Sequence, residues 1–155
     1  MPHIHEKIDF TVEVFIVYKN KILLRKHDKY KIWLSVGGHI ELDEDPPHAA
    51  VREVKEEVGL DVVLYKDSSV QSFKFDTYTE LIPPMYLNRH RVNPTHEHVT
   101  LVYFAKASTD KLVLSNTEKS DDCKWFTQKE LEEDTEIKYD IKFYALKALE
   151  TLKDN

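Results

Sequence analysis

The residues best suited to chemistry in this 155-residue chain are three closely spaced glutamates. Glu53, Glu56 and Glu57 stand at positions i, i+3 and i+4, so on a helix their carboxylates would share one face. Carboxylates this close repel one another, and an isolated cluster of this kind is ordinarily a solvated acidic face. Gly37 and Gly38 stand shortly upstream, and glycine is used where a backbone takes positive φ or lets a ligand approach. Together these glutamates and glycines indicate a functional site where a ligand approaches the backbone.

A helix over residues 46–58 must carry the glutamates. Asp45 is a candidate N-cap, and the two prolines after it are tolerated in the first helical turn, where their missing N–H groups are not needed. Gly59 follows the last helical position as the expected left-handed terminator. Apolar residues at helical spacing define the buried side of the helix: Ala49, Ala50, Val54 and Val58.

Strands and further helices are expected around this segment. β-branched and aromatic residues predict strands over residues 10–18, 21–26, 62–64, 69–73, 99–105 and 124–126, with Lys19-Asn20 as a two-residue hairpin turn between the first two. Residues 33–36 form a short apolar run, and residues 74–97 are expected to be irregular. Thr127 and Glu130 have the form of a capping box, and an apolar stripe over residues 137–152 predicts a closing helix. We expect one α/β (α+β) domain spanning residues 1–155.

Bulk properties narrow the class of protein. A net charge of −6 argues against a broad surface for long nucleic acids. No run approaches the roughly 18 apolar residues of a membrane span, and residues 1–7 lack the apolar core of a signal peptide. One cysteine, Cys123, excludes an internal disulfide and suits a reducing compartment. We expect a cytoplasmic protein, monomeric or homodimeric, that acts on small phosphate compounds.

Read with its spacing, the glutamate segment has the form G-x5-E-x7-R-E-U-x-E-E-x-G-U, where U is a bulky aliphatic residue. Every fixed position is filled, by Gly38, Glu44, Arg52, Glu53, Val54, Glu56, Glu57, Gly59 and Leu60. This pattern resembles the Nudix box of the Nudix hydrolase family, which includes MutT-like proteins. The resemblance implies a mixed β-sheet sandwiched between α-helices, with the box as a loop–helix–loop motif.

The resemblance also implies a metal site. Hard oxygen ligands and a phosphate substrate favour Mg²⁺, with Mn²⁺ as a substitute. The implied metal ligands are Glu53, Glu56, Glu57, Glu44 and a carbonyl of the Gly37-Gly38 turn.

The resemblance implies catalytic roles as well. Arg52 stands four residues before Glu56 and is expected to orient that carboxylate, although an ordinary surface ion pair has the same spacing. For the general base we favour Glu56 or Glu53. Glu118, on the loop before the last short strand, is the alternative.

Residues outside the box are candidates for substrate contacts. Arg25 and Arg89 are predicted to contact phosphates, although solvated surface arginines would have the same pattern. Tyr30 and Tyr86 are predicted to stack on a base, with Trp33 and Phe75 considered for the same role.

Two histidines stand apart from the box. His96 and His98 place two imidazoles on one face of a strand, with His90 nearby in sequence. Two imidazoles raise the possibility of zinc, but no third ligand has convincing spacing. A polar face that lines a cleft is the preferred interpretation.

The expected reaction is Mg²⁺-dependent hydrolysis of a phosphoanhydride in a nucleoside diphosphate linked to another group, with a nucleoside triphosphate preferred. Dinucleoside polyphosphates and nucleotide sugars are alternative substrates, and Tyr78 lies where hydrolases of the former tend to have a tyrosine. The proline mark of ADP-ribose pyrophosphatases is absent at positions 75–77. A non-catalytic nucleotide-sensing module is the alternative of another class.

Overall fold

The computed structural model describes residues 3–114 and 120–155. The strands are β1 (Ile8–Tyr18), β2 (Lys21–His27), β3 (Trp33–Leu34), β4 (Val36–His39), β5 (Val62–Leu64), β6 (Lys74–Phe75), β7 (Tyr78–Thr79), β8 (Tyr86–Asn93), β9 (His96–Ala107) and β10 (Ser120–Phe126). The helices are α1 (Pro46–Val58), α2 (Gln128–Glu133) and α3 (Tyr139–Thr151). The large sheet has the order β10-β2-β1-β9-β5, while β3, β4 and β8 pair with β2, β1 and β9.

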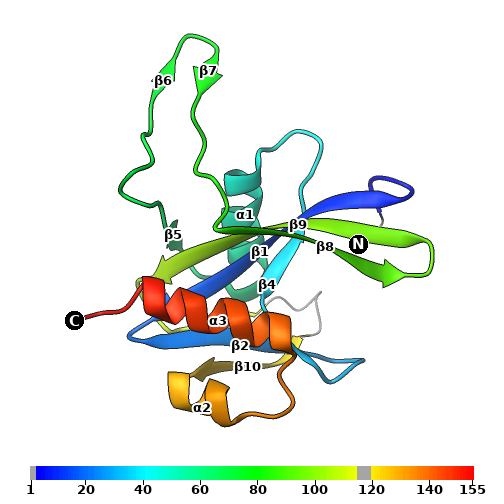
Figure 1. Ribbon diagram of the computed structural model, residues 1–155, viewed down its shortest axis with the longest axis vertical. Coiled ribbons are helices and arrows are strands. Elements are labelled where there is room, and N and C mark those ends of the chain that lie inside the picture. The colour runs from blue at the N-terminus through cyan, green and yellow to red at the C-terminus, as the bar shows by residue number, and fades with distance from the viewer. Residues whose placement is uncertain (1–2, 115–119) are drawn as a thin grey trace.

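Strand β1 lies at the centre of this mixed sheet (Figure 1). It runs parallel to β9, with Ile8 opposite Glu97 and Val17 opposite Lys106, and antiparallel to β2 and β4. A parallel neighbour needs a long crossover connection, and here that connection contains β4, α1 and β8. The segment that carries the glutamates therefore lies, in sequence, between the paired strands β1 and β9.

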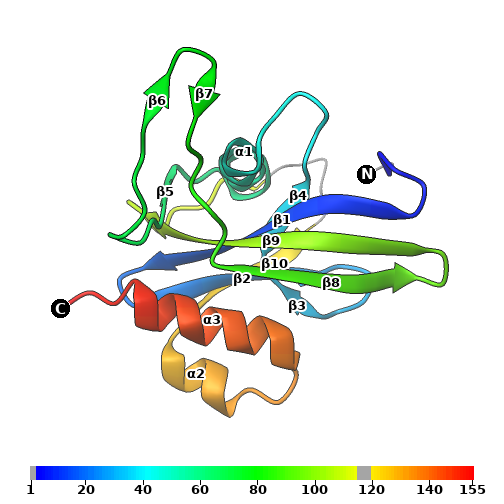
Figure 2. The ribbon, with the colours of Figure 1, turned by 45° about the horizontal axis from the view of Figure 1, so that its top comes forward.

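Alternate side chains of β1 face opposite sides of the sheet. Val12, Val14 and Ile16 belong to a buried cluster that includes residues of α1, whereas Phe15 and Val17 belong to one that includes residues of α3. Figure 2 shows α1 on one face and α2 and α3 on the other. The prediction of a mixed sheet between helices is confirmed.

The ends of α1 follow from its capping residues. The Asp45 side chain accepts a hydrogen bond from the backbone N–H of His48 at 2.8 Å. At the other end Gly59 takes φ 72°, and its N–H donates to the Lys55 carbonyl at 3.1 Å. The helix predicted over residues 46–58 is confirmed.

Two other local predictions are confirmed by backbone geometry. Lys19 and Asn20 both have positive φ, as a tight hairpin turn requires, and Thr127 and Glu130 form a complete capping box. None of the described helices combines the length and the apolar character needed to cross a membrane.

Predictions for the middle of the chain are wrong in two places. Residues 74–97 are not irregular, because β8 forms there and pairs with β9. Its residues are mostly exposed, so no apolar alternation marks it as a strand. Residues 69–73 form no strand, and the hairpin β6–β7 follows them, standing away from the large sheet (Figure 1).

Candidate active site

The glutamate face of α1 lies against β4. Gly37 and Gly38 are ladder residues of β4, opposite Glu13 and Val12, so the prediction that they form a turn is wrong. The missing side chain at position 38 permits the close approach of helix and strand. A Cβ there would lie 2.4–2.8 Å from the carboxylate atoms of Glu53, which is closer than atoms can pack.

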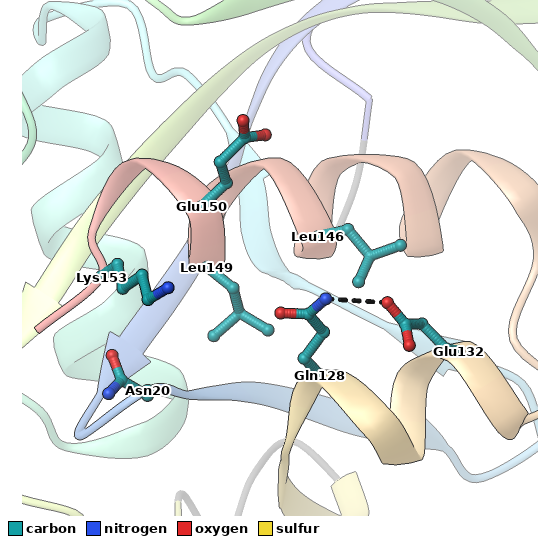
Figure 3. A pocket seen from close by; sticks show the side chains of 7 residues that line it. All are labelled: Asn20, Gln128, Glu132, Leu146, Leu149, Glu150 and Lys153. Carbon is teal, nitrogen blue, oxygen red and sulfur yellow. Dashed lines mark hydrogen bonds between the residues drawn. The ribbon is translucent and has the colours of Figure 1, made fainter.

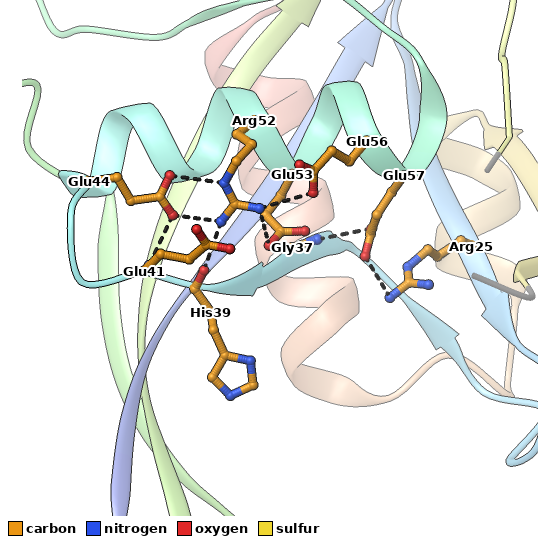
Figure 4. A network of polar contacts seen from close by, with 9 residues as sticks. All are labelled: Arg25, Gly37, His39, Glu41, Glu44, Arg52, Glu53, Glu56 and Glu57. Atoms are coloured by element: carbon orange, nitrogen blue, oxygen red, sulfur yellow. Dashed lines mark hydrogen bonds and ion pairs between the residues drawn. The ribbon is translucent and has the colours of Figure 1, made fainter. Parts of the chain in front are cut away.

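Arg52 joins four groups of this site (Figure 4). Its Nε and Nη2 donate to the two carboxylate oxygens of Glu44 at 2.9 and 2.6 Å. Its Nη1 donates to Glu53 at 2.9 Å and to Glu56 at 3.0 Å, and Nη2 also donates to the His39 carbonyl at 3.0 Å. The hydrogen bonds with Glu44 are the main cause that raises the pKa of Arg52, and they lower the pKa of Glu44.

Glu57 is held by a second arginine. One carboxylate oxygen lies 3.3 Å from Nη2 of Arg25, and the other accepts the backbone N–H of Gly37 at 3.3 Å. Nε of Arg25 donates to the carbonyl of Ser35 at 3.2 Å, which ties the guanidinium to the backbone between β3 and β4. The box glutamate most remote from Arg52 is therefore anchored to the sheet.

Burial differs sharply among the box carboxylates. The side chains of Glu44, Glu53 and Glu57 are 4–6% exposed, whereas that of Glu56 is 59% exposed. Burying ionised carboxylates is costly unless cations and hydrogen bonds compensate them. The four carboxylates carry four formal negative charges and the two arginines carry two positive ones. The net charge of the group is −2, a deficit of two positive charges.

This donor set fits a divalent cation. Carboxylate oxygens are hard ligands of the kind that Mg²⁺ and Mn²⁺ take in proteins, and the deficit of two charges matches such an ion. The bare backbone at Gly38 gives the ligand set room beside the strand. The assignment of individual ligands stays a prediction.

A cavity of about 270 Å³ opens beside the glycines of β4, and Glu13, Arg25 and His98 are among its lining residues. Burial is the main cause that raises the pKa of Glu13 to about 7, while a hydrogen bond with Ser35 opposes the rise and the charge of Asp140 adds to it. Glu13 is not among the site residues predicted from the sequence. A charged residue inside the apolar run of β1 was the available signal.

Substitution of Glu13 by glutamine should make stability less dependent on pH. The folded protein favours the protonated carboxyl of Glu13. The contribution of this carboxyl to folding stability is therefore complete below pH 4.5 and is lost as the pH rises to about 7. The shift corresponds to roughly 3 kcal/mol as an upper bound. Urea melts should show Glu13→Gln gaining on the wild type at pH 8 but not at pH 4.5. Equal differences at both pH values would contradict the assignment.

The residues predicted to bind substrate separate into two groups. Arg25 meets the box through Glu57, as described above. Arg89 instead pairs with Glu97, Nε to Oε2 at 2.7 Å, on the β8–β9 pair. Tyr86 packs its ring on Phe104 and on residues of α3.

The other candidates also have neighbours outside the box. The Tyr30 ring is 62% exposed and lies 4.9 Å from that of His27. Trp33 packs edge-on against Phe126 at 5.0 Å, which agrees with a core role. Phe75 lies on the β6–β7 hairpin, and Glu118 lies outside the described residues.

Another cavity, of about 360 Å³, lies between α2 and α3 (Figure 3). Gln128 of α2 donates to Glu132 there at 2.8 Å, and Leu146 and Leu149 of α3 supply apolar surface. None of its lining residues belongs to the box. This cavity is therefore separate from the box.

Comparisons with known proteins find relatives in both sequence and structure. The family model described as NUDIX domain matches residues 9–146. A crystal structure of a NUDIX-family hydrolase from Clostridium perfringens is similar over 94% of this chain and 98% of that one, with 35% identity and a TM-score of 0.82. The MutT NUDIX hydrolase of Burkholderia pseudomallei, 19% identical with a TM-score of 0.65, covers 95% of this chain and 99% of its own and shares the fold.

Curated relatives are similar over a shorter region. The dihydroneopterin triphosphate diphosphatase of Escherichia coli strain K12 is 34% identical over 92 residues, which are 57% of this chain and 57% of that protein. The Haemophilus influenzae protein of the same name is 33% identical over 104 residues, 57% of this chain and 64% of its own. The chain thus spans less than two thirds of the length of these relatives.

Proposed function

Because this chain belongs to the NUDIX family, we propose that it hydrolyses a phosphoanhydride bond in the triphosphate of a nucleoside or of a pterin. The observation that carries the proposal is the set of four carboxylates and two arginines packed against β4. The triphosphate is supported by the relatives named as dihydroneopterin triphosphate diphosphatases. The products would be a monophosphate and pyrophosphate.

Mg²⁺ is the proposed cofactor, with Mn²⁺ as a substitute. Glu53, Glu56 and Glu57 would hold it, together with Glu44 and a carbonyl of the glycine pair in β4. When bound, such an ion supplies positive charge for the phosphate oxygens and makes an attacking water more acidic.

The side chains of the box have complementary tasks in this proposal. Glu56, the most exposed of the four carboxylates, accepts the proton of the attacking water. The water oxygen forms a bond to phosphorus, the bridging P–O bond breaks, and the leaving pyrophosphate takes the electron pair. Arg52 holds Glu56 and Glu53 in place during this step, and Arg25 holds Glu57.

Glu13 is the residue proposed to recognise the heterocyclic ring of the substrate. Guanine and pterin share a 2-amino-4-oxo pyrimidine ring, whose adjacent N–H groups match the two oxygens of a carboxylate. Glu13 lines the cavity beside the glycine pair, and Arg25, which pairs with Glu57 of the box, lines the same cavity. A purine or pterin carrying this ring should therefore bind better than adenine or a pyrimidine.

A substrate panel tests the proposal. Purified protein with Mg²⁺ should release pyrophosphate from dihydroneopterin triphosphate and GTP faster than from ATP or CTP. Faster cleavage of a dinucleoside polyphosphate or a nucleotide sugar would select one of the alternative substrates instead. If every compound stays intact while the protein is folded and Mg²⁺ raises its melting temperature, the catalytic proposal fails in favour of a nucleotide-sensing role.

A further inference from the structure

A second cluster of ligand-bearing side chains lies near the start of β1 and β9. Asp9 of β1 stands opposite His98 in the β1–β9 register, and His96 precedes it on the same face of β9. The N-terminal segment adds His3, and the end of β4 adds His39. Three ring nitrogens surround Oδ2 of Asp9: Nδ1 of His3 at 3.0 Å, Nε2 of His96 at 3.1 Å and Nε2 of His39 at 3.2 Å.

Burial makes this cluster costly as it stands. Asp9 is 1% exposed and His96 is 3% exposed. Nδ1 of His96 lies 3.1 Å from the carbonyl of Glu6, to which it can only donate, so the neutral ring presents a lone pair at Nε2. Nε2 of His96 lies 3.1 Å from Oδ2 of Asp9 without the alignment of a hydrogen bond, and the buried Nε2 atoms of His39 and His98 also lack an aligned partner. Acceptors buried against one another are strongly unfavourable unless a cation lies between them.

Burial disfavours the charged form of two of these rings. Burial, followed by repulsion from the neighbouring histidines, lowers the pKa of His98 to about 4. Burial likewise lowers the pKa of His39, although Asp9 opposes this. For Asp9 itself, burial alone would raise the pKa, but the His5 N–H and the surrounding rings lower it below its usual value. A carboxylate surrounded by imidazole nitrogens is a donor set that transition metals take in proteins.

We propose that His3, Asp9, His96 and His98 bind a divalent transition metal of the zinc type. Their four ligand atoms all lie within 4.8 Å of one another, the one group of this kind among the residues that the structure describes. A tetrahedral zinc site with bonds of about 2.0–2.1 Å separates its ligand atoms by roughly 3.4 Å, so small side-chain shifts suffice. Imidazole donors suit Zn²⁺ better than Mg²⁺, which distinguishes this cluster from the glutamates of the box.

Outer hydrogen bonds already orient the ligands. The His5 N–H donates to Oδ1 of Asp9 at 2.7 Å, and the Glu6 carbonyl fixes the tautomer of His96. Such partners are characteristic of metal-bound carboxylates and histidines. The sequence alone offers no third zinc ligand beside His96 and His98. The fold supplies two more, from residues far from β9 in sequence.

The metal would fasten the N-terminal segment to the wall of the substrate cavity. His98 and His39 both line that cavity, and the His39 carbonyl accepts a hydrogen bond from Arg52 of the box. With four protein ligands the site is closed to solvent ligands, which is typical of structural zinc. Its role is therefore to hold the cavity in shape, separately from the reaction at the glutamates.

Zinc binding to the chelator-treated, full-length protein tests this inference. Competition against a chromophoric chelator should show one tightly bound Zn²⁺, and Co²⁺ in its place should give the visible absorption of a tetrahedral site. His3→Ala removes a half-exposed ligand with little risk to folding and should weaken Zn²⁺ binding by about 100-fold or more. His98→Asn should do the same. His48→Ala, an exposed histidine on α1, is the matched control and should bind as the wild type does.

The outcomes separate this inference from the proposed function. Glu57→Gln should retain the Zn²⁺ site even though it impairs the box. Zinc affinity unchanged in both His3→Ala and His98→Asn, or lost only in Glu57→Gln, would overturn the assignment. Neither result depends on which substrate, if any, the protein hydrolyses.

Discussion

Glutamine in place of Glu57 should lower turnover by about a thousand-fold, because loss of roughly 4 kcal/mol of transition-state stabilisation gives such a factor. The change removes one negative charge from the proposed metal site but keeps an acceptor for the Gly37 N–H. Folding should be nearly intact, since glutamine has the same size. The measurements are initial rates of pyrophosphate release and thermal melts with and without Mg²⁺.

The melts decide whether the loss arises at the metal. In the wild type Mg²⁺ should raise the melting temperature, as any ligand of the folded state does, and in Glu57→Gln this increase should be lost. Glu150→Gln is the matched control, because Glu150 is exposed on α3 and pairs with Lys147 rather than with a box residue. A fully active Glu57→Gln protein would show that the metal role is misassigned.

Alanine at position 38 should lower activity by about 100-fold and stability by about 1–3 kcal/mol. The added Cβ would lie 2.4 Å from Oε1 of Glu53, so the carboxylate must move and lose its 2.9 Å contact with Arg52. Gly37→Ala should instead impair folding, because its Cβ would meet the backbone oxygen of Val12 at 2.1 Å. Rates and urea melts of the two variants should separate these effects.

A double-mutant cycle identifies the mechanism of the Gly38→Ala defect. If alanine acts by displacing Glu53, then adding it to Glu53→Gln should cost little further activity. Independent, multiplying losses would show that position 38 affects the reaction by another route.

The box and its helix were predictable because their determinants are local. Asp45 and Gly59 mark the helix ends, and the fixed spacing of Arg52, Glu53 and Glu56 places these residues on neighbouring turns. The glycine pair was recognised as a point of close approach. Its conformation was not, because an extended strand and a turn both use glycine, and only the pairing of β4 with β1 distinguishes them.

Other parts of the site depend on contacts that sequence spacing does not encode. Glu13 and His98 come to one cavity because β1 and β9 are neighbours in the sheet. The Asp9–His96 contact arises from the same pairing. Strand β8 was missed because most of its side chains are exposed, which removes the periodic apolar signal. For Arg89 and Tyr86, only the residue type suggested a contact with substrate. In the structure Arg89 pairs with Glu97 and Tyr86 packs on Phe104.

The parallel pairing of β1 with β9 also has a consequence for how the protein folds. Ile8 meets Glu97 and Val17 meets Lys106, so the contact closes a loop that contains the entire box. Closing such a long loop lowers the conformational entropy of the chain before the strand contacts can stabilise it, and this slows folding. During synthesis, α1 leaves the ribosome well before β9, the parallel partner of β1. Catalytic activity should therefore appear only after residue 107 has emerged.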